Sequence, residues 1–260
     1  MNILCIGDIV GKPGREAVET LLPVLIDEHD IEFVIANVEN AAGGSGIIPR
    51  LAESLLASGC DVLTTGDHVW DKKEILEFLD DEKRILRPCN FPEGSPGRGV
   101  YVATTKKGKK IAVINLLGRV FMKYNVNCPF KAFDQLIEDV RKETLNVIVD
   151  FHAEATSEKI AFGHFVNGKA SGVFGTHTHV QTADEKILSK KTAYITDVGM
   201  TGPFDSVIGQ NKDKIVERFL KSMPSKFEVA TEDVWLNGVI FSIDEKTGLA
   251  KNISRVQRRM

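Results

Sequence analysis

Short apolar runs alternate along this chain with longer stretches in which apolar residues recur every three or four positions. The short runs have the length of buried strands and span residues 2–6, 33–38, 62–65, 147–151 and 172–176. The longer stretches predict helices over residues 14–27, 49–58, 71–80, 129–143 and 157–165. In the first of them, apolar side chains recur at helical spacing at Val18, Leu21, Leu22 and Leu25. Strands that alternate with helices indicate a layered α/β fold with parallel strands in its first half.

The middle and the end of the chain depart from this alternation. Residues 87–98 contain Pro88, Pro92 and Pro96 and predict a loop. The segments 100–104 and 110–116, joined at Lys107-Gly108, predict an antiparallel hairpin. Further strands are expected at residues 193–196, 226–229, 238–243 and 250–256. Because the sequence has no internal repeat, low-complexity tract or linker, we expect one α/β domain with two sheets.

Charge and cysteine content narrow the class of protein. With 33 Lys and Arg against 36 Asp and Glu, the net charge is only −3, which gives no basic surface for sequence-independent nucleic-acid binding. No segment approaches the roughly 18 uninterrupted apolar residues of a membrane span, and the N-terminus lacks the basic start of a secretory signal. The four cysteines are scattered, as in a protein of a reducing compartment. We therefore expect a cytoplasmic protein with no membrane partner.

Residues that can bind metal follow five of the predicted strands. They are Asp8, Glu39 with Asn40, Asp67 with His68, His152, and His177 with His179. In α/β sheets the carboxyl ends of the strands meet at one edge, where ligands bind. Carboxylate, amide and imidazole groups suit iron, manganese or zinc, and the lack of cysteine excludes a zinc–thiolate site. Each residue taken singly also fits a turn, a helix cap or a buried polar position. Together, the residues at the ends of these five strands favour a metal site.

Several blocks carry a resemblance to a known family. Gly7-Asp8, Gly66-Asp67-His68 and the segment 175–179 are similar to the successive blocks of calcineurin-type metallophosphoesterases. The longer blocks at residues 7–11, 38–42, 150–158 and 196–203 resemble the YmdB-like bacterial branch of that superfamily. The resemblance covers essentially the whole chain, in order. It implies a single metallophosphoesterase domain over residues 1–260, built as a two-sheet β-sandwich flanked by helices on both faces.

The resemblance also implies the roles of the site residues. One metal ion is bound by Asp8, Glu39, Asn40 and His179. Glu39 bridges to a second ion, which is completed by Asp67, His152 and His177. His68 matches the catalytic histidine of the family. The implied cofactors are two transition-metal ions per chain, with iron or manganese favoured and zinc left open. Two positions depart from the family pattern: Val10 stands where the broader superfamily has His, and Asp67 stands where an Asn is usual.

These residues predict a hydrolase that acts on phosphodiesters, with 2′,3′- or 3′,5′-cyclic nucleotides as expected substrates. A hydroxide that bridges the two metals would attack phosphorus, and His68 would protonate the departing alkoxide. Asp197 is expected either to orient a ligand histidine or to serve a turn. Two alternatives stay open: a two-metal hydrolase of another bond, such as an amide, and a nucleotide-binding regulatory module with little turnover. RNA as a substrate and a homo-oligomeric state also stay open.

Overall fold

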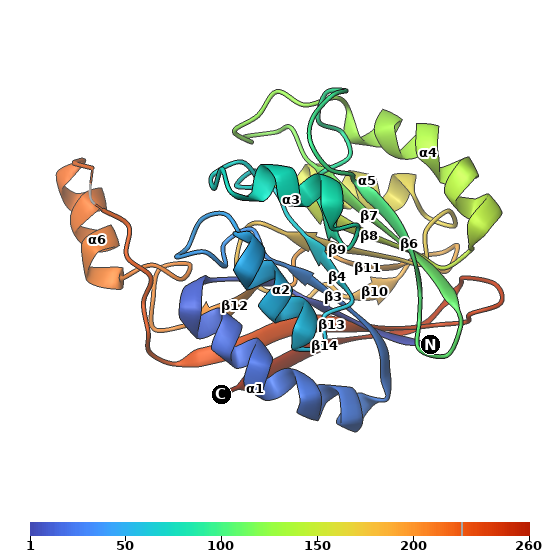
Figure 1. Cartoon of the computed structure of the whole chain (residues 1–260), viewed down its shortest axis with the longest axis horizontal. Coiled ribbons are helices and arrows are strands. Elements are labelled where there is room, and N and C mark those ends of the chain that lie inside the picture. Colours follow the sequence, from blue (N-terminus) through green and yellow to red (C-terminus); the bar gives the residue numbers. More distant parts are fainter. Residues whose placement is uncertain (225) are drawn as a thin grey trace.

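The computed structural model describes residues 1–224 and 226–260 and contains two β-sheets with helices on their outer faces (Figure 1). The strands of the first sheet are β1 (Asn2–Ile6), β2 (Asp8–Ile9), β3 (Ile31–Asn37), β4 (Val62–Thr64), β5 (Ile85–Leu86), β12 (Met200–Pro203), β13 (Val234–Ile243) and β14 (Ala250–Arg259). Those of the second sheet are β6 (Val100–Thr104), β7 (Lys110–Leu117), β8 (Val147–His152), β9 (Gly172–Thr176), β10 (Lys186–Ile187) and β11 (Ala193–Ile195). The helices are α1 (Gly11–His29), α2 (Pro49–Ala57), α3 (Ile75–Asp81), α4 (Pro129–Glu143), α5 (Thr156–Phe165) and α6 (Lys212–Lys221).

Both sheets combine parallel and antiparallel strand pairs. The first sheet runs in the order β2-β12-β13-β1-β3-β4-β5, with β14 paired to β13, and its strands β1, β3, β4 and β5 are parallel. The second runs β10-β11-β9-β8-β7-β6, with β7, β8, β9 and β11 parallel. The two ends of the chain meet in the first sheet, where Asn2 on β1 lies opposite Ser242 on β13. The parallel strands of both sheets therefore carry their carboxyl-terminal loops toward a common site, described below.

The central strands are buried on both faces, which explains their nearly continuous apolar sequence. On β1, Ile3 and Cys5 pack in the layer between the sheets, together with side chains such as Phe174 of β9. Leu4 and Ile6 point the other way, toward the helices on the outer face. Because side chains alternate along a strand, one apolar run contributes to two core layers.

Helices cover the outer face of each sheet. Helices α1, α2 and α3 place Leu22, Leu55 and Leu79 in the layer outside the first sheet. Helices α4 and α5 place Phe133 and Phe162 against the second sheet. Helix α6 projects away from both sheets (Figure 1). The predicted α/β fold, a two-sheet sandwich with helices on both faces, is thus confirmed. Among the described helices, none combines the length and the apolar character needed to cross a bilayer.

Some predicted elements differ from the structure. Residues 226–229 were expected to form a strand, and this was wrong: only Val229 pairs, in an isolated bridge with Gln210. A strand needs a neighbour along its length, and this segment has one at a single residue. Helix α6 was not predicted, although Asn211 caps it by accepting a hydrogen bond from the Lys214 N–H. Helix α3 begins at Ile75 rather than at residue 71, since residues before it form turns.

Candidate metal centre

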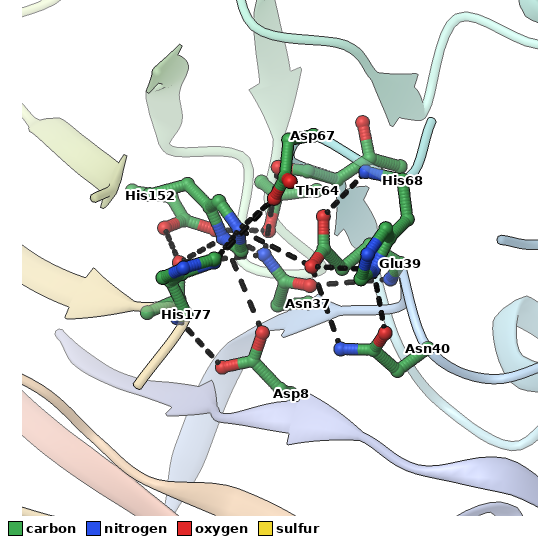
Figure 2. A network of polar contacts seen from close by, with 12 residues as sticks. Asp8, Asn37, Glu39, Asn40, Thr64, Asp67, His68, His152 and His177 are labelled. Atoms are coloured by element: carbon green, nitrogen blue, oxygen red, sulfur yellow. Dashed lines mark hydrogen bonds and ion pairs between the residues drawn. The ribbon is translucent and has the colours of Figure 1, made fainter. Parts of the chain in front are cut away.

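His68 and six of the seven predicted ligands come together where loops of the two sheets meet (Figure 2). The seventh, His179, joins them through its contact with Asn40. The first sheet supplies Asp8 at β2 and the side chains that follow β3 and β4, and the second sheet supplies His152 at the end of β8 and the histidines that follow β9. Asp8, Glu39, Asn40, Asp67 and His152 are buried. The site therefore draws on segments that are far apart in the sequence, from residue 8 to residue 179.

One group consists of Glu39, Asp67, His152 and His177. Each offers one ligand atom, and these four atoms all lie within 4.8 Å of one another. His152 Nε2 lies 3.2 Å from Glu39 Oε1 and 3.2 Å from Asp67 Oδ1. His177 Nδ1 lies 3.0 Å from His152 Nε2. Four nitrogen and oxygen donors, which follow or end four different strands, thus converge on a single point.

A second group lies beside the first and consists of Asp8, Asn40 and His179. Asp8 Oδ1 lies 3.9 Å from His179 Nε2 and 4.0 Å from His152 Nδ1. Asn40 Nδ2 lies 3.0 Å from His179 Nε2 and 3.4 Å from Glu39 Oε1. Glu39 therefore contacts members of both groups.

Each of the three histidines turns one ring nitrogen toward the cluster and has a fixed partner on the other nitrogen. His152 Nδ1 lies 2.8 Å from Thr176 Oγ1. His177 Nε2 lies 3.2 Å from Glu154 Oε2, and His179 Nδ1 lies 2.9 Å from the carbonyl oxygen of Ile208. Histidines that bind metal almost always donate their second N–H in this way, which leaves the other nitrogen with a free lone pair. The orientation of all three rings thus matches that of metal ligands.

Three carboxylates at the centre carry more negative charge than a buried site tolerates without a counter-charge. Burial raises the pKa of Asp8. Burial also acts on Glu39, but His152 and His68 outweigh it and hold the pKa of Glu39 well below its usual range. Burial also opposes ionisation of Asp67, but hydrogen bonds from His152 and His177 outweigh burial and lower the pKa of Asp67 below its usual range. These carboxylates act on His152 in turn: burial opposes its protonation, but Glu39 and Asp67 raise its pKa well above the ordinary value.

The residues at this centre fit divalent cations. Asp8 Oδ1 is buried and accepts no hydrogen bond, whereas Asp8 Oδ2 accepts one from the His177 N–H at 3.1 Å. A buried carboxylate oxygen without a donor is normally satisfied by a cation or a water. Gly66 keeps this space open, because a Cβ there would lie 2.3 Å from both Glu39 Oε2 and His152. The donors are carboxylate oxygens and imidazole nitrogens, the set preferred by zinc, manganese and iron.

His68 lies at the edge of the centre and differs from the other histidines. Its backbone N–H donates to Glu39 Oε2 at 3.2 Å, and its Nδ1 lies 2.9 Å from Asn40 Oδ1. The ring is partly exposed, whereas His152 is fully buried. Burial lowers the pKa of His68, but the Glu39 and Asp67 carboxylates reverse this and raise it above its ordinary value. His68 is thus placed to hold a proton at the rim of the site.

Of the polar residues behind the centre, Asp150 was given no role from the sequence. Asp150 on β8 is fully buried and accepts hydrogen bonds from the hydroxyls of Thr64 and Thr176 and from the Asn37 amide. A charged residue inside an apolar strand, two positions before His152, was the available signal. Asp197 was expected to orient a ligand histidine or to serve a turn. It contacts the backbone N–H of Thr178 at 3.1 Å rather than an imidazole.

A cleft of about 660 Å³ opens in front of these residues. One side is polar and includes Glu39, His68 and the histidines at 177 and 179. The lining also includes the apolar side chains of Ile208 and Phe227, which are 52% and 57% exposed. A cavity of this size accommodates a small organic ligand.

Comparison with known proteins identifies the family. The family model described as YmdB-like protein matches residues 4–256. The chain belongs to the YmdB-like family. This confirms the family predicted from the sequence blocks.

Relatives of this YmdB-like chain are similar over nearly their full length. A protein of Bacillus subtilis (strain 168), named 2′,3′-cyclic-nucleotide 2′-phosphodiesterase, is 50% identical over 257 residues, which cover 98% of this chain and 96% of that protein. The crystal structure of a hypothetical protein from Thermus thermophilus has a TM-score of 0.92 at 38% identity, covering 100% of this chain and 99% of that one. The crystal structure of a novel phosphatase from Mycoplasma pneumoniae has a TM-score of 0.93 at 36% identity, covering 100% and 93%.

Proposed function

We propose that this protein is a dinuclear metal-dependent phosphodiesterase that hydrolyses cyclic nucleotides. The observation that carries the proposal is the arrangement of three histidines, each with one nitrogen held by a fixed partner and the other turned toward buried carboxylates. The Bacillus relative, at 50% identity, is named for the hydrolysis of 2′,3′-cyclic nucleotides, which supports this substrate class.

In this proposal the two groups of residues hold two cations. Asp8, Glu39, Asn40 and His179 hold one, and Glu39 is shared with a second that Asp67, His152 and His177 complete. The oxygen and nitrogen donors suit iron, manganese and zinc, and the family resemblance favours iron or manganese among them. Bound cations supply positive charge for the phosphate oxygens and lower the pKa of water.

His68 is the proposed general acid. Its Nδ1 is engaged with Asn40 and Glu39, so Nε2 is the nitrogen from which a proton can pass to the leaving alkoxide. The nearby carboxylates raise the pKa of His68 above its ordinary value, which favours the protonated form that a general acid needs. General acid catalysis of this kind contributes roughly 10²- to 10⁴-fold in rate.

The apolar part of the cleft lining supports a substrate that carries a nucleoside. A phosphate held at the polar side leaves the rest of the ligand to face Ile208 and Phe227. Stacking of a base on an aromatic ring contributes about 1–3 kcal/mol. Phe227→Ala should therefore raise KM for cyclic nucleotides by about 5- to 150-fold and leave KM for a small aliphatic phosphodiester unchanged. Phe219→Ala on α6 is the matched control, because Phe219 is 79% exposed and does not line the cleft.

The direct test is to remove metal with a chelator, reload with manganese, iron or zinc, and measure metal content and hydrolysis together. We expect two ions per chain and conversion of 2′,3′-cyclic AMP to a nucleoside monophosphate, with 3′,5′-cyclic AMP and an aryl phosphodiester as comparison substrates. Binding of cyclic nucleotide without turnover would instead support a regulatory module. Hydrolysis of amides but not of phosphodiesters would overturn the substrate class.

We also propose that residues 1–260 form one metallophosphoesterase domain in the cytoplasm. The first sheet contains both Asn2 and Ser242, and the site takes residues from both sheets, which supports one folding unit. The cysteines Cys5, Cys60, Cys89 and Cys128 are free, as in a reducing compartment. A single cooperative unfolding transition would support the one-domain assignment, and two separate transitions would contradict it.

A further inference from the structure

The segment 177–179, His177-Thr178-His179, has an unusual backbone and is called the histidine turn below. Both histidines have positive φ angles, 98° for His177 and 65° for His179. Residues other than glycine rarely adopt this region, and they keep it only where the surroundings hold the backbone in place. The directions of two proposed ligands therefore depend on whatever holds this turn.

Two charged side chains behind the turn bind its backbone. Asp197, which follows β11, accepts a hydrogen bond from the Thr178 N–H through Oδ2 at 3.1 Å and one from the Gly199 N–H through Oδ1 at 2.8 Å. Lys159 on α5 donates to the carbonyl oxygen of Thr176 at 2.7 Å and to Asp197 Oδ2 at 2.5 Å. Together they bind the carbonyl just before the first histidine and the N–H between the two.

Both charges are removed from water: Lys159 is 1% exposed and Asp197 is 0% exposed. A buried ion pair adds little net stability compared with apolar side chains of the same size, so stability alone does not account for it. The local backbone is built around this contact. A Cβ at Gly175 would lie 1.8 Å from the carbonyl oxygen of Thr196 and 3.3 Å from Lys159 Cε. The absence of a side chain at Gly175 thus lets β9 and β11 approach closely enough for Asp197 to reach Thr178.

We propose that Lys159 and Asp197 are positioning residues of the metal centre. They contact no substrate and no proposed ligand side chain; they act through the backbone of the histidine turn and set the directions of the His177 and His179 rings. This rests on the proposed function only in that a metal ion binds these two histidines.

The test compares Lys159→Met, Asp197→Leu and the double variant, each stripped of metal and titrated with Mn²⁺ by calorimetry. We expect all three to bind Mn²⁺ about 10- to 100-fold more weakly, the range found when residues that orient metal ligands are changed. The melting temperatures should follow a different order. Each single variant leaves one buried charge unpaired and should melt well below wild type, whereas the double variant should regain part of that loss. Stability and metal affinity should therefore separate in the double variant.

Ile137→Ala on α4 is the matched control, because it removes buried apolar contacts on the outer face of the second sheet. It should lower the melting temperature and leave Mn²⁺ affinity unchanged. Hydrogen exchange of the Thr178 amide should be faster in the Lys159 and Asp197 variants than in Ile137→Ala. If a single variant fails to fold, the double variant and the exchange rate still decide the question.

Recovery of both melting temperature and Mn²⁺ affinity in the double variant would overturn the positioning role, as would wild-type affinity in any of the three variants. These outcomes are independent of turnover. A wild-type protein that binds Mn²⁺ but hydrolyses no phosphodiester would remove the proposed function and leave the positioning role intact. A wild-type protein that binds no metal would overturn both.

Discussion

Asp150 offers a quantitative test of the environment behind the metal centre. Its side chain is fully buried on β8, where the hydroxyls of Thr64 and Thr176 and the Asn37 amide donate to it. Burial disfavours its charged form more strongly than His152 and these hydrogen bonds favour it, and it raises the pKa from the ordinary 3.8 to about 6. In the unfolded chain, the carboxyl is exposed to water and returns to its ordinary value.

This difference makes folding stability depend on pH with a definite sign. Between the two pKa values the folded protein binds more protons than the unfolded chain, so the contribution of Asp150 to stability is greatest below pH 4 and is lost as pH rises through about 6. The full difference corresponds to about 3 kcal/mol. Between pH 5 and pH 8 the loss amounts to about 1.4 kcal/mol.

The perturbation is Asp150→Asn, which cannot ionise. Free energies of unfolding of both proteins are measured by urea titration at pH 5, 6, 7 and 8, with a chelator present so that metal binding does not contribute. Asn presents one acceptor oxygen instead of two and loses a hydrogen bond, but that cost does not depend on pH. The stability of wild type minus that of the variant should therefore fall by about 1.4 kcal/mol from pH 5 to pH 8, whatever its absolute value.

Thr64→Val is the matched control, because it removes one hydrogen bond to Asp150 and keeps the carboxyl. The fall with pH should persist in that background. A difference that stays flat with pH would refute the reasoning, since the carboxyl would then titrate alike in both states. A difference that rises with pH would show that the hydrogen bonds outweigh burial.

Three further predictions concern the centre itself. Glu39→Gln should weaken both metal sites, because Glu39 contacts both groups of residues; full metal occupancy measured by elemental analysis would remove the bridging role. His68→Ala should keep its metal content and lose roughly 10²- to 10⁴-fold in rate, and lose less with a nitrophenol leaving group; equal impairment on all leaving groups would exclude general acid catalysis. Asp67→Asn removes a negative charge near His152 and His177 and should weaken metal binding, raise activity at neutral pH and shift the basic pH optimum downward. If that variant were slower at every pH with equal metal content, Asp67 would have a positive catalytic role.

The sequence was a good guide wherever a local pattern is enough to specify structure. The apolar spacing over residues 129–143 predicted α4 with its observed ends. The hairpin of β6 and β7 followed from two apolar runs joined at Lys107-Gly108. The segment 226–229 misled for the opposite reason: its composition favours a strand, but pairing depends on a neighbour that only the folded chain can supply.

The candidate ligands were predictable because their chemistry lies in the side chain. Carboxylates and imidazoles directly after apolar runs mark strand ends, and parallel strands bring such ends to one edge. Asp8, Glu39 and His152 could be named on that basis. The sequence does not show how the strands are arranged in the two sheets, so the residue pattern alone could not show which candidate ligands lie next to one another.

The sequence by itself determined the alternation of strands and helices, the family, and the residue types at the strand ends, because each depends on neighbours within a few positions. Only the tertiary structure decided which partner holds the second nitrogen of each histidine, and that Lys159 and Asp197 bind the backbone of the histidine turn. The partner of His179 is the backbone carbonyl of Ile208, a group that every residue possesses. Such contacts leave no mark in residue identity. They exist because folding brings together backbone and side-chain groups that are far apart along the chain and excludes the water that would otherwise bind them.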